Sequence, residues 1–401
     1  MDKATTPAWT AGSGAKPAVD RGPAPGLAWA LALGGFFLLW FFGKPVAAWA
    51  FKVPKGWHIP LKRWIGDGMD WLVEEASFGL FSFTELTRFI AAMIDVPYRI
   101  ALSILSTGWL EGQGSAAVQQ LPPLSWIAVI GLVMLLGRYA GGWRLALLAG
   151  GCFLFILLFG QWDNAMVTLA SIVIAVPLGV TGGLALGLAG YRWPRVEQAL
   201  TPVLDLMQTV PVFAYLVPIL FLFGFGPTAA VVATVIYALP PMTRVAMVAL
   251  KGVSDEVQDL GRMVGCSRRQ MTWRVMVPSA MPGLMVGVNQ VIMLSLNMVI
   301  IASMIGAGGL GFEVLSALRR LDIGTGIEAG LAIVALAIAL DRLSQAFADR
   351  QRTHEKSGSP GIVRRHPYAV TALALIGTTA LLAVGGGAFQ SFPESWQLST
   401  G

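Results

Sequence analysis

The stretch KGVSDEVQDLGRMVGCSRRQMTWRVMVP, residues 251–278, decides how this chain is organised. It belongs to a polar segment, Arg244 to Arg274, that carries six basic residues. The runs on either side of it, Leu206 to Thr243 and Ser279 to Phe312, contain no charged residue. Long uncharged runs are typical of membrane spans, so the sequence predicts a basic loop at a membrane surface. Such a loop either docks onto a soluble partner or is an ordinary solvated loop.

Helix-capping signals predict two short helices within this loop. Ser254 can cap the first helix, and Gly265 can end it in the left-handed conformation. Ser267 and Gln270 have the spacing of a capping box, which predicts the start of the second helix. Pro278 limits how far that second helix can run undisturbed.

The loop resembles the "EAA" loop of ABC-importer permeases, whose pattern is E-A-A-x3-G-x9-I-x-L-P. The matching positions here are Asp259, Leu260, Gly261, Gly265, Val275, Val277 and Pro278. The glycine and the proline match outright, while Leu260 and Gly261 replace the two alanines. The flanking sequences LDLMQTVPVFAYLVPILFLFGFG, YALPPMTR, PSAMPGLMVGVNQ and IASMIGAGGLG resemble permeases of glycine betaine/proline betaine (osmoprotectant) transporters, from about Trp162 to about Ala348.

This resemblance implies a type I ABC importer permease fold in which the loop forms coupling helices that insert into a cytoplasmic ATPase subunit. It implies as partners two ATPase subunits, an extracytoplasmic (periplasmic) solute-binding protein and a second permease copy, giving a homodimer. ATP and Mg would be bound by the ATPase, and this chain would bind no cofactor. The residues expected to couple are Asp259, Leu260, Gly261, Arg262, Gly265, Ser267, Arg268, Arg269 and Pro278.

The composition agrees with a polytopic membrane protein. Only 12% of the 401 residues are charged, 55% are hydrophobic and the mean hydropathy is +0.68, which is unusual for a soluble domain. The basic residues lie in loops between apolar runs, so the net charge of +6 does not indicate nucleic-acid binding. Cys152 lies in a predicted span and Cys266 in the loop, so we expect no disulfide and no metal site.

The first third of the chain reads as four segments. Residues 1–25 are rich in Ala, Gly and Pro, which predicts a disordered tail. Residues 26–43 are uncharged and apolar, which predicts an uncleaved transmembrane anchor. A cleavable signal peptide is the alternative for the anchor, because Ala48-Trp49-Ala50 resembles a cleavage site. Residues 44–121 predict amphipathic helices in the membrane interface, or else a small soluble domain. Residues 122–162 predict two additional spans.

The remainder predicts a permease core, 163–348, that contains the loop 251–278. Within it, FGFGPT (223–228) and GAGG (306–309) predict turns between spans, and EVLSALRRLDIG predicts a short amphipathic helix. Residues 349–401 predict a basic cytoplasmic linker, a last span at Ala369–Ala388 and a short tail. The fold class is therefore an all-α polytopic membrane protein with about eight transmembrane helices and additional interfacial helices.

The distribution of Lys and Arg predicts the orientation. With the loop 251–278 in the cytoplasm, 19 of the 28 basic residues lie on the cytoplasmic side and 9 on the other. Positive residues concentrate in cytoplasmic loops, so the sequence predicts a cytoplasmic amino terminus. The resemblance implies that the membrane is a bacterial inner membrane.

The predicted spans lack the groups that would power transport by themselves. The four longest uncharged runs contain no ionisable side chain, which argues against proton coupling and favours a net-neutral substrate. The sequence has no G-x4-G-K-[ST] motif, so ATP would be hydrolysed on a separate polypeptide. An enzyme active site is not indicated either, since no nucleophile–base or metal cluster is visible.

A few polar and aromatic residues within the spans could line a translocation path: Gln208, Thr209, Pro211, Phe213, Tyr215, Asn289, Gln290 and Asn297. Pro211 should kink its helix. The asparagines and Gln290 share a helical face that either lines the path or joins two helices by hydrogen bonds. The aromatic rings could attract a quaternary ammonium, or simply pack against lipid. Glycines from Gly182 to Gly190 predict close helix packing.

The predicted function is therefore the permease subunit of an ATP-driven, binding-protein-dependent importer. The resemblance implies a quaternary-ammonium compatible solute such as glycine betaine, proline betaine or choline. One alternative is an ABC permease for another small polar solute, such as a sulfonate or an amino acid. A second alternative, of another class, is an osmolyte carrier or channel that works without ATP.

Overall fold

The computed structural model describes residues 25–46, 59–77, 79, 81–111 and 118–352, together with Gly377, Phe392 and Gln397. The predicted tail apart from Pro25, and the predicted last span apart from Gly377, lie outside these described residues. The chain divides into two units, Met1–Leu72 and Val73–Gly401, which are treated separately below.

The first unit contains helix α1, Pro25–Val46, at the position of the predicted anchor. Its large apolar side chains are exposed; Phe41, for example, is 73% exposed. The amphipathic helix α3, Leu61–Glu74, begins in this unit and has no buried residue. Its Arg63 forms an i,i+4 ion pair with Asp67 at 3.6 Å.

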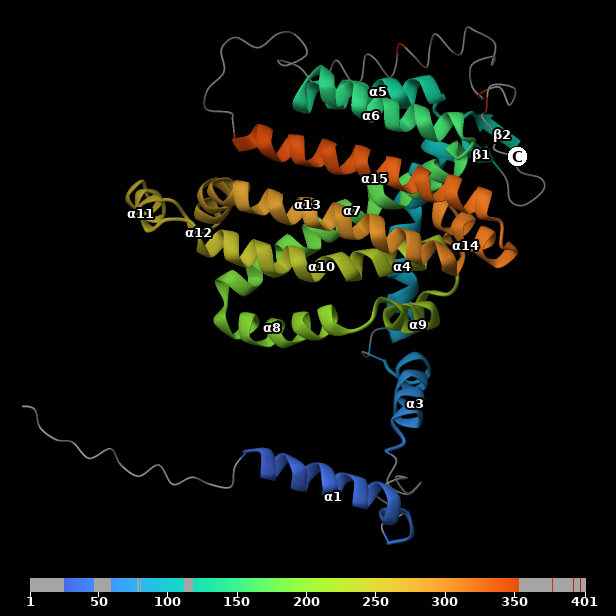
Figure 1. The fold of residues 1–401 in the computed structure, drawn as a ribbon. Coiled ribbons are helices and arrows are strands. Elements are labelled where there is room, and N and C mark those ends of the chain that lie inside the picture. Colours follow the sequence, from blue (N-terminus) through green and yellow to red (C-terminus); the bar gives the residue numbers. More distant parts are fainter. Residues whose placement is uncertain are drawn as a thin grey trace, which may run out of the picture. The chain divides into compact units, whose positions relative to one another are not determined.

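Helix α4, Phe83–Leu102, is the first helix that lies entirely within the second unit. Ser82 begins it with a capping box, in which the Ser82 hydroxyl accepts from the Glu85 N–H and the Glu85 carboxylate accepts from the Ser82 N–H. The π-helical turn η2, Ser103–Thr107, extends it, and the combined segment is long and apolar enough to cross a membrane. In Figure 1 it runs across the direction of α10 and α13. Because a helix of this length and hydropathy can also span a membrane, its position in the membrane interface stays a prediction.

A small antiparallel sheet that the sequence reasoning did not predict follows α4. Strand β1, Trp109–Glu111, pairs with β2, Val118–Leu121. Gly108 has φ +74, and a Cβ there would lie 2.4 Å from the Leu121 carbonyl oxygen, so the turn into the sheet requires glycine.

Six further helices lie side by side in a bundle (Figure 1). They correspond to six of the predicted spans, with shifted ends: α5 Trp126–Gly141, α6 Trp143–Leu158, α7 Trp162–Arg192, α10 Pro227–Lys251, α13 Val277–Ala302 and α15 Ile323–Arg352. Within the described residues five helical segments are long and apolar enough to span a membrane, a bent pair makes a sixth, and three apolar helices are shorter. The all-α polytopic fold class is thus confirmed.

Helix α10 packs along both α7 and α13. Glycines on α7 allow the two backbones to approach closely, as predicted. A Cβ on Gly183 would lie 2.5 Å from Met242 Cβ, and one on Gly187 would lie 2.5 Å from Ala246 Cβ. Gly182, by contrast, faces Leu239 at an ordinary 3.7 Å.

The predicted kink at Pro211 is a complete break in the helix. Helix α8, Pro194–Thr209, and helix α9, Val212–Phe223, are bent by 105° relative to each other. Pro211 has φ −57 and ψ 139, and the preceding Val210 is also extended, which is the conformation that a proline favours in its predecessor. The predicted span from Leu206 to the 223–228 turn is therefore a bent pair of helices and not one straight helix.

The GAGG motif ends α13 as predicted. The π-helical turn η5, Ser303–Ala307, contains Gly306 at φ +100, and Gly308 and Gly309 also have positive φ. Helix α14, Leu310–Arg320, then begins, and the buried Thr168 hydroxyl of α7 accepts from the Leu310 N–H at 3.0 Å. This contact satisfies one of the unpaired N–H groups at the start of α14.

Candidate functional site: the 251–278 segment and the polar residues of the spans

The first predicted helix of the loop is α11, Asp255–Met263. Gly265 has φ +80, its N–H donates to the Arg262 carbonyl at 3.0 Å, and the Cys266 N–H donates to the Gly261 carbonyl at 3.1 Å. These two bonds form a Schellman motif, so Gly265 ends the helix in the manner predicted.

Ser254 occupies the N-cap position of α11, but its side chain makes no cap hydrogen bond. The Ser254 hydroxyl hydrogen-bonds to the Glu256 carboxylate, and this bond lowers the pKa of Glu256 below its usual value. The charge thus kept on Glu256 lies in the first turn of α11, where the helix dipole favours a negative charge.

The second helix begins at the predicted capping box but is not short. The Ser267 N–H donates to Gln270 Oε1 at 2.8 Å, and the Ser267 hydroxyl accepts from the Gln270 N–H at 3.3 Å. Helix α12, Arg268–Gln270, continues through the π-helical turn η4, Met271–Met276, into α13 without interruption. The prediction of two short helices is therefore wrong for the second.

The π-helical turn explains why Pro278 does not stop this helix. The Val277 N–H donates to the Thr272 carbonyl, five residues back, so the helix widens by one residue just before the proline. Pro278 follows directly after this wider turn, and the helix continues past it into α13. The segment from Arg268 to Ala302 is consequently one continuous helical run that leads directly from the loop into the bundle.

The outer face of α11 is apolar. Leu260, Met263 and Val264 are 58%, 79% and 74% exposed. Gly261, one residue after Leu260, is buried, and a Cβ on it would lie 2.7 Å from Met271 Cε. Gly261, which replaces one alanine of the EAA pattern, therefore leaves room for the Met271 side chain. Leu260, at the other alanine position, faces outward.

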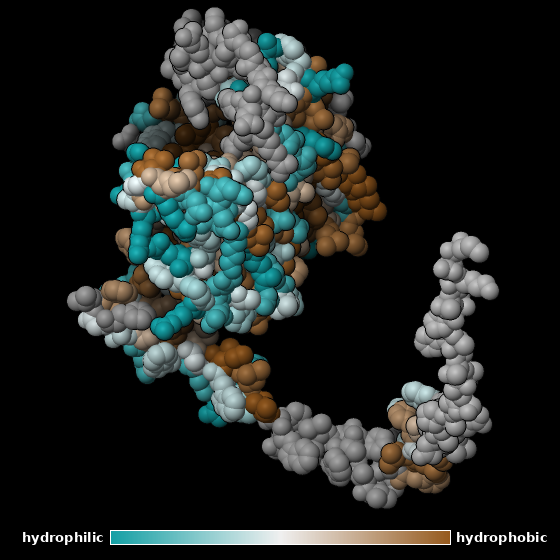
Figure 2. All heavy atoms as spheres, turned by 90° about the vertical axis from the view of Figure 1, so that its left-hand side faces the viewer, coloured by the Kyte–Doolittle hydropathy of each residue, from teal (hydrophilic) through white to brown (hydrophobic). Residues whose placement is uncertain are grey.

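The charged residues of the loop surround this apolar face. Asp259 pairs with Arg262 at 2.9 Å, and both are exposed, as are Arg268 and Arg269. Figure 2, which looks onto this end of the bundle, shows mainly hydrophilic residues there, with hydrophobic residues at its margins. Such a surface, with an apolar ridge among charges, is suited to docking against another protein.

Two ion pairs that sequence reasoning missed hold α8 against α10 near the loop. Lys251 pairs with Glu197 at 2.5 Å, and Arg244 pairs with Asp205. The two residues of each pair are 54 and 39 positions apart in the sequence. The sequence shows acidic residues in α8 and basic residues in α10, but such charges do not specify which residues pair.

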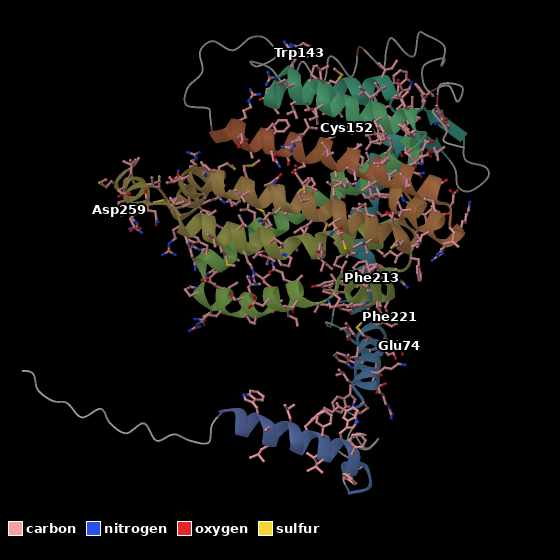
Figure 3. All side chains as sticks on the ribbon, viewed as in Figure 1. Glu74, Trp143, Cys152, Phe213, Phe221 and Asp259 are labelled. Carbon is pink, nitrogen blue, oxygen red and sulfur yellow. The ribbon has the colours of Figure 1, made fainter. Side chains whose placement is uncertain are left out.

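The predicted path residues before and after Pro211 fall into an exposed and a buried group. Gln208, Thr209, Pro211 and Phe213 are exposed. Tyr215 packs edge-on against Tyr237, with ring centroids 6.5 Å apart, and its buried hydroxyl has no hydrogen-bond partner. Figure 3 shows Phe213 on α9 at the opposite end of the bundle from Asp259.

The predicted face of α13 is likewise divided. The Ser344 hydroxyl of α15 donates to Asn289 Oδ1, so Asn289 joins two helices. Gln290 and Asn297 are exposed and continue a stripe of exposed side chains at helical spacing, formed by Pro282, Val286, Gln290, Met293 and Asn297. These two residues are thus accessible for a path, and Asn289 is not.

Comparison with known proteins gives a family match. Residues 175–353 match the model of the family described as "Binding-protein-dependent transport system inner membrane component". The glycine betaine/proline betaine transport system permease protein ProW of Escherichia coli is 38% identical over 296 residues, which cover 74% of this chain and 77% of ProW. The glycine betaine/carnitine transport permease protein GbuB of Listeria monocytogenes is 35% identical, over 74% of this chain and 98% of GbuB.

A third relative matches more of this chain but is longer. The trimethylamine N-oxide transport system permease protein TmoV of Ruegeria pomeroyi is 36% identical over 373 residues, which cover 93% of this chain. The match covers 54% of TmoV, so the chain spans about half the length of that relative.

Proposed function

Because the chain belongs to the family of binding-protein-dependent transport system inner-membrane components, we propose that it is the membrane-spanning subunit of an ATP-driven importer. The observation that carries the proposal is the geometry of the loop in this family context. A glycine-terminated helix with an apolar outer face is followed by a capping box, from which one continuous helix runs through a π-helical turn to Ala302.

Motion of a docked ATPase would reach the membrane through this run. Leu260, Met263 and Val264 would be buried in a cleft of the ATPase, with the surrounding charges at the rim. Because α12, η4 and α13 form one helical segment, a displacement of the loop tilts α13 as a rigid element. ATP and Mg would be bound by the ATPase, which is a separate polypeptide.

The exposed stripe on α13 supports a homodimer with the path at the interface. Gln290 and Asn297 would otherwise face lipid, where a polar side chain is costly. A second copy of the chain would cover the stripe and place two sets of these side chains around a weakly polar passage. Phe213, exposed on α9, and the Tyr215 ring are the aromatic groups available to that passage.

The orientation we propose has the loop 251–278 and the amino terminus in the cytoplasm of a bacterial inner membrane, with lipid around the apolar sides. A membrane-impermeant maleimide should then label half-exposed Cys266 in inside-out vesicles and spare it in right-side-out vesicles. Labelling of Cys266 in right-side-out vesicles would reverse the proposed topology.

For the substrate we propose a quaternary-ammonium compatible solute of the glycine betaine/proline betaine type, delivered by an extracytoplasmic binding protein. ProW and GbuB, whose names specify betaines and carnitine, support this class. Trimethylamine N-oxide is a second candidate, because the match to TmoV extends over 93% of this chain. All these solutes combine a methylated nitrogen with a negative oxygen.

The test is to purify the chain with its ATPase and binding protein and to measure ATP hydrolysis with a series of solutes. We expect glycine betaine, proline betaine or trimethylamine N-oxide to stimulate hydrolysis, and sulfonates and amino acids without a methylated nitrogen to leave it unchanged. Stimulation by a sulfonate or an ordinary amino acid alone would contradict the proposed substrate class.

A further inference from the structure

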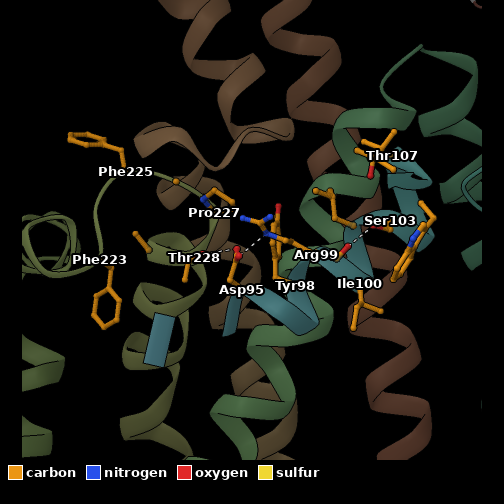
Figure 4. A pocket seen from close by; sticks show the side chains of 15 residues that line it. Asp95, Tyr98, Arg99, Ile100, Ser103, Thr107, Phe223, Phe225, Pro227 and Thr228 are labelled. Atoms are coloured by element: carbon orange, nitrogen blue, oxygen red, sulfur yellow. Dashed lines mark hydrogen bonds and ion pairs between the residues drawn. The ribbon is translucent and has the colours of Figure 1, made fainter. Parts of the chain in front are cut away.

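A cavity of about 700 Å³ lies where α4 and β1 meet the start of α10. Its wall combines one ion pair, hydroxyl groups and aromatic rings, contributed by Asp95, Tyr98, Arg99, Trp109, Phe223 and Thr228. Figure 4 shows Asp95, Arg99 and Thr228 together, with the interactions between them drawn. None of these residues was expected to form a site from the sequence.

The cavity is at the end of α10 away from the loop 251–278. Helix α10 starts at Pro227, which lines the cavity, and ends at Lys251, about 37 Å away along 25 residues. Gly226, also in the wall, lies beside the GAGG loop, since a Cβ on Gly306 would be 3.6 Å from the Gly226 nitrogen. In the proposed orientation this is the side from which a solute arrives.

The ion pair fixes the positions of one negative and one positive charge in the cavity. Asp95 accepts from Arg99 Nε at 2.6 Å and from the Thr228 hydroxyl at 3.1 Å, so its carboxylate is held from two elements. The Asp95 side chain is 27% exposed and that of Arg99 is 74% exposed. The negative charge therefore lies in the wall, while the positive charge extends toward solvent.

Such an adjacent pair of charges complements a zwitterion better than a single ion. A lone cation near Asp95 would be repelled by Arg99, and a lone anion near Arg99 would be repelled by Asp95. A small molecule with both charges can align against the pair and satisfy each end. The carboxylate or oxide of the ligand would meet Arg99, which has donors in a planar fork.

The aromatic residues specify the positive end of such a ligand. The Tyr98 side chain is buried in the wall, and Trp109 is 53% exposed. Methylated ammonium groups carry their charge on the surface of the methyl groups and are attracted to aromatic faces, most strongly to that of tryptophan. The wall of this one cavity thus carries the Asp95 carboxylate, the Arg99 guanidinium and the exposed Trp109 ring, which together match a ligand with a methylated ammonium and a negative oxygen.

We propose that this cavity is a low-affinity arrival site for a small methylated zwitterion such as glycine betaine, on the side of the permease away from the coupling loop. The proposal rests on the proposed function, which supplies the direction of transport and the solute class. The headgroup of phosphatidylcholine has the same chemistry as a free solute, so the experiment separates the two.

The experiment uses the full chain in nanodiscs of phosphatidylglycerol alone and follows the methyl protons of glycine betaine by saturation-transfer NMR. We expect a saturable signal that choline, which lacks the negative charge, and 3,3-dimethylbutanoate, which lacks the positive charge, displace at least about tenfold less well. Trp109→Ala and Asp95→Asn should weaken binding about tenfold. Asp67→Asn, which breaks a second i,i+4 arginine–aspartate pair, should leave it unchanged.

A double variant separates ligand recognition from a structural role. Asp95→Arg combined with Arg99→Asp keeps an i,i+4 ion pair and the net charge, but it moves the carboxylate away from Thr228. We expect it to remain as weak as Asp95→Asn. Binding at the wild-type level in this variant would overturn the proposal, because the pair would then only stabilise α4.

Two further outcomes would also overturn the proposal. One is that, in nanodiscs of phosphatidylcholine and phosphatidylglycerol, the chain perturbs the phosphatidylcholine headgroups while free glycine betaine does not bind. The other is ATP-driven uptake by the assembled transporter at an unchanged rate in Trp109→Ala, together with no measurable binding to the wild-type chain. That second outcome would leave the proposed function standing, whereas a wild-type complex without ATP-driven uptake would refute the proposed function itself.

Discussion

Replacement of Gly265 by proline is expected to abolish solute-stimulated ATP hydrolysis while the chain still inserts into the membrane. Gly265 has φ +80 and donates its N–H to the Arg262 carbonyl. Proline fixes φ near −65° and has no N–H, so α11 cannot end where it does. The strain and the lost bond together cost the loop about 2–3 kcal/mol of folding free energy, so the docking face of α11 is displaced and hydrolysis is expected to stay at its unstimulated rate.

Gly265→Asn is the matched control for this prediction. Asparagine tolerates the left-handed conformation and keeps the N–H, so we expect most of the stimulated hydrolysis to remain. Asp259→Arg, which replaces the ion pair with Arg262 by a repulsion at the rim of the docking face, should also reduce stimulation. Uptake at the wild-type rate in Gly265→Pro would contradict a coupling role for the loop.

The second large effect is expected from Gly187→Ala, through stability. The added Cβ would lie 2.5 Å from Ala246 Cβ and 2.9 Å from the Thr243 carbonyl oxygen, neither of which can rotate away. Helices α7 and α10 must therefore separate, and overpacking of this kind costs about 1–3 kcal/mol. The measurement is the thermal unfolding midpoint of the purified chain in detergent, which should fall.

Gly182→Ala provides the control, because it adds the same methyl group to the same helix. Its Cβ would meet Leu239 Cδ1 at 3.7 Å, an ordinary contact, and alanine is a better helix former than glycine. We expect an unchanged or slightly higher midpoint. Equal losses in the two variants would show that the close approach of α7 and α10 does not limit stability.

Local signals in the sequence predicted local structure well. The left-handed Gly265, the Ser267–Gln270 capping box, the GAGG turn and the break at Pro211 each depend on the conformational preferences of a few adjacent residues. Uncharged runs likewise predicted most apolar helices, because hydropathy over about 20 residues determines insertion. Their ends were less accurate, as charged α8 and the continuous helix from Arg268 show.

Contacts between distant segments could not be predicted. The Thr228–Asp95 bond joins residues 133 positions apart, and the Thr168–Leu310 cap joins residues 142 apart. Uniformly apolar helices carry little information about which neighbour they contact, and the polar residues that fix these contacts look like isolated side chains in the sequence. The cavity beside α4 was missed for the same reason.

The central claim is that this helical bundle moves its solute by means of a separate ATPase docked on the 251–278 loop. The most direct measurement is uptake of radiolabelled glycine betaine into proteoliposomes, with the binding protein outside and ATP inside, for the complete complex and for the chain alone. We predict accumulation against a gradient by the complete complex with ATP, and none by the chain alone or with a non-hydrolysable ATP analogue. Uptake by the chain alone at the rate of the complete complex would contradict the claim.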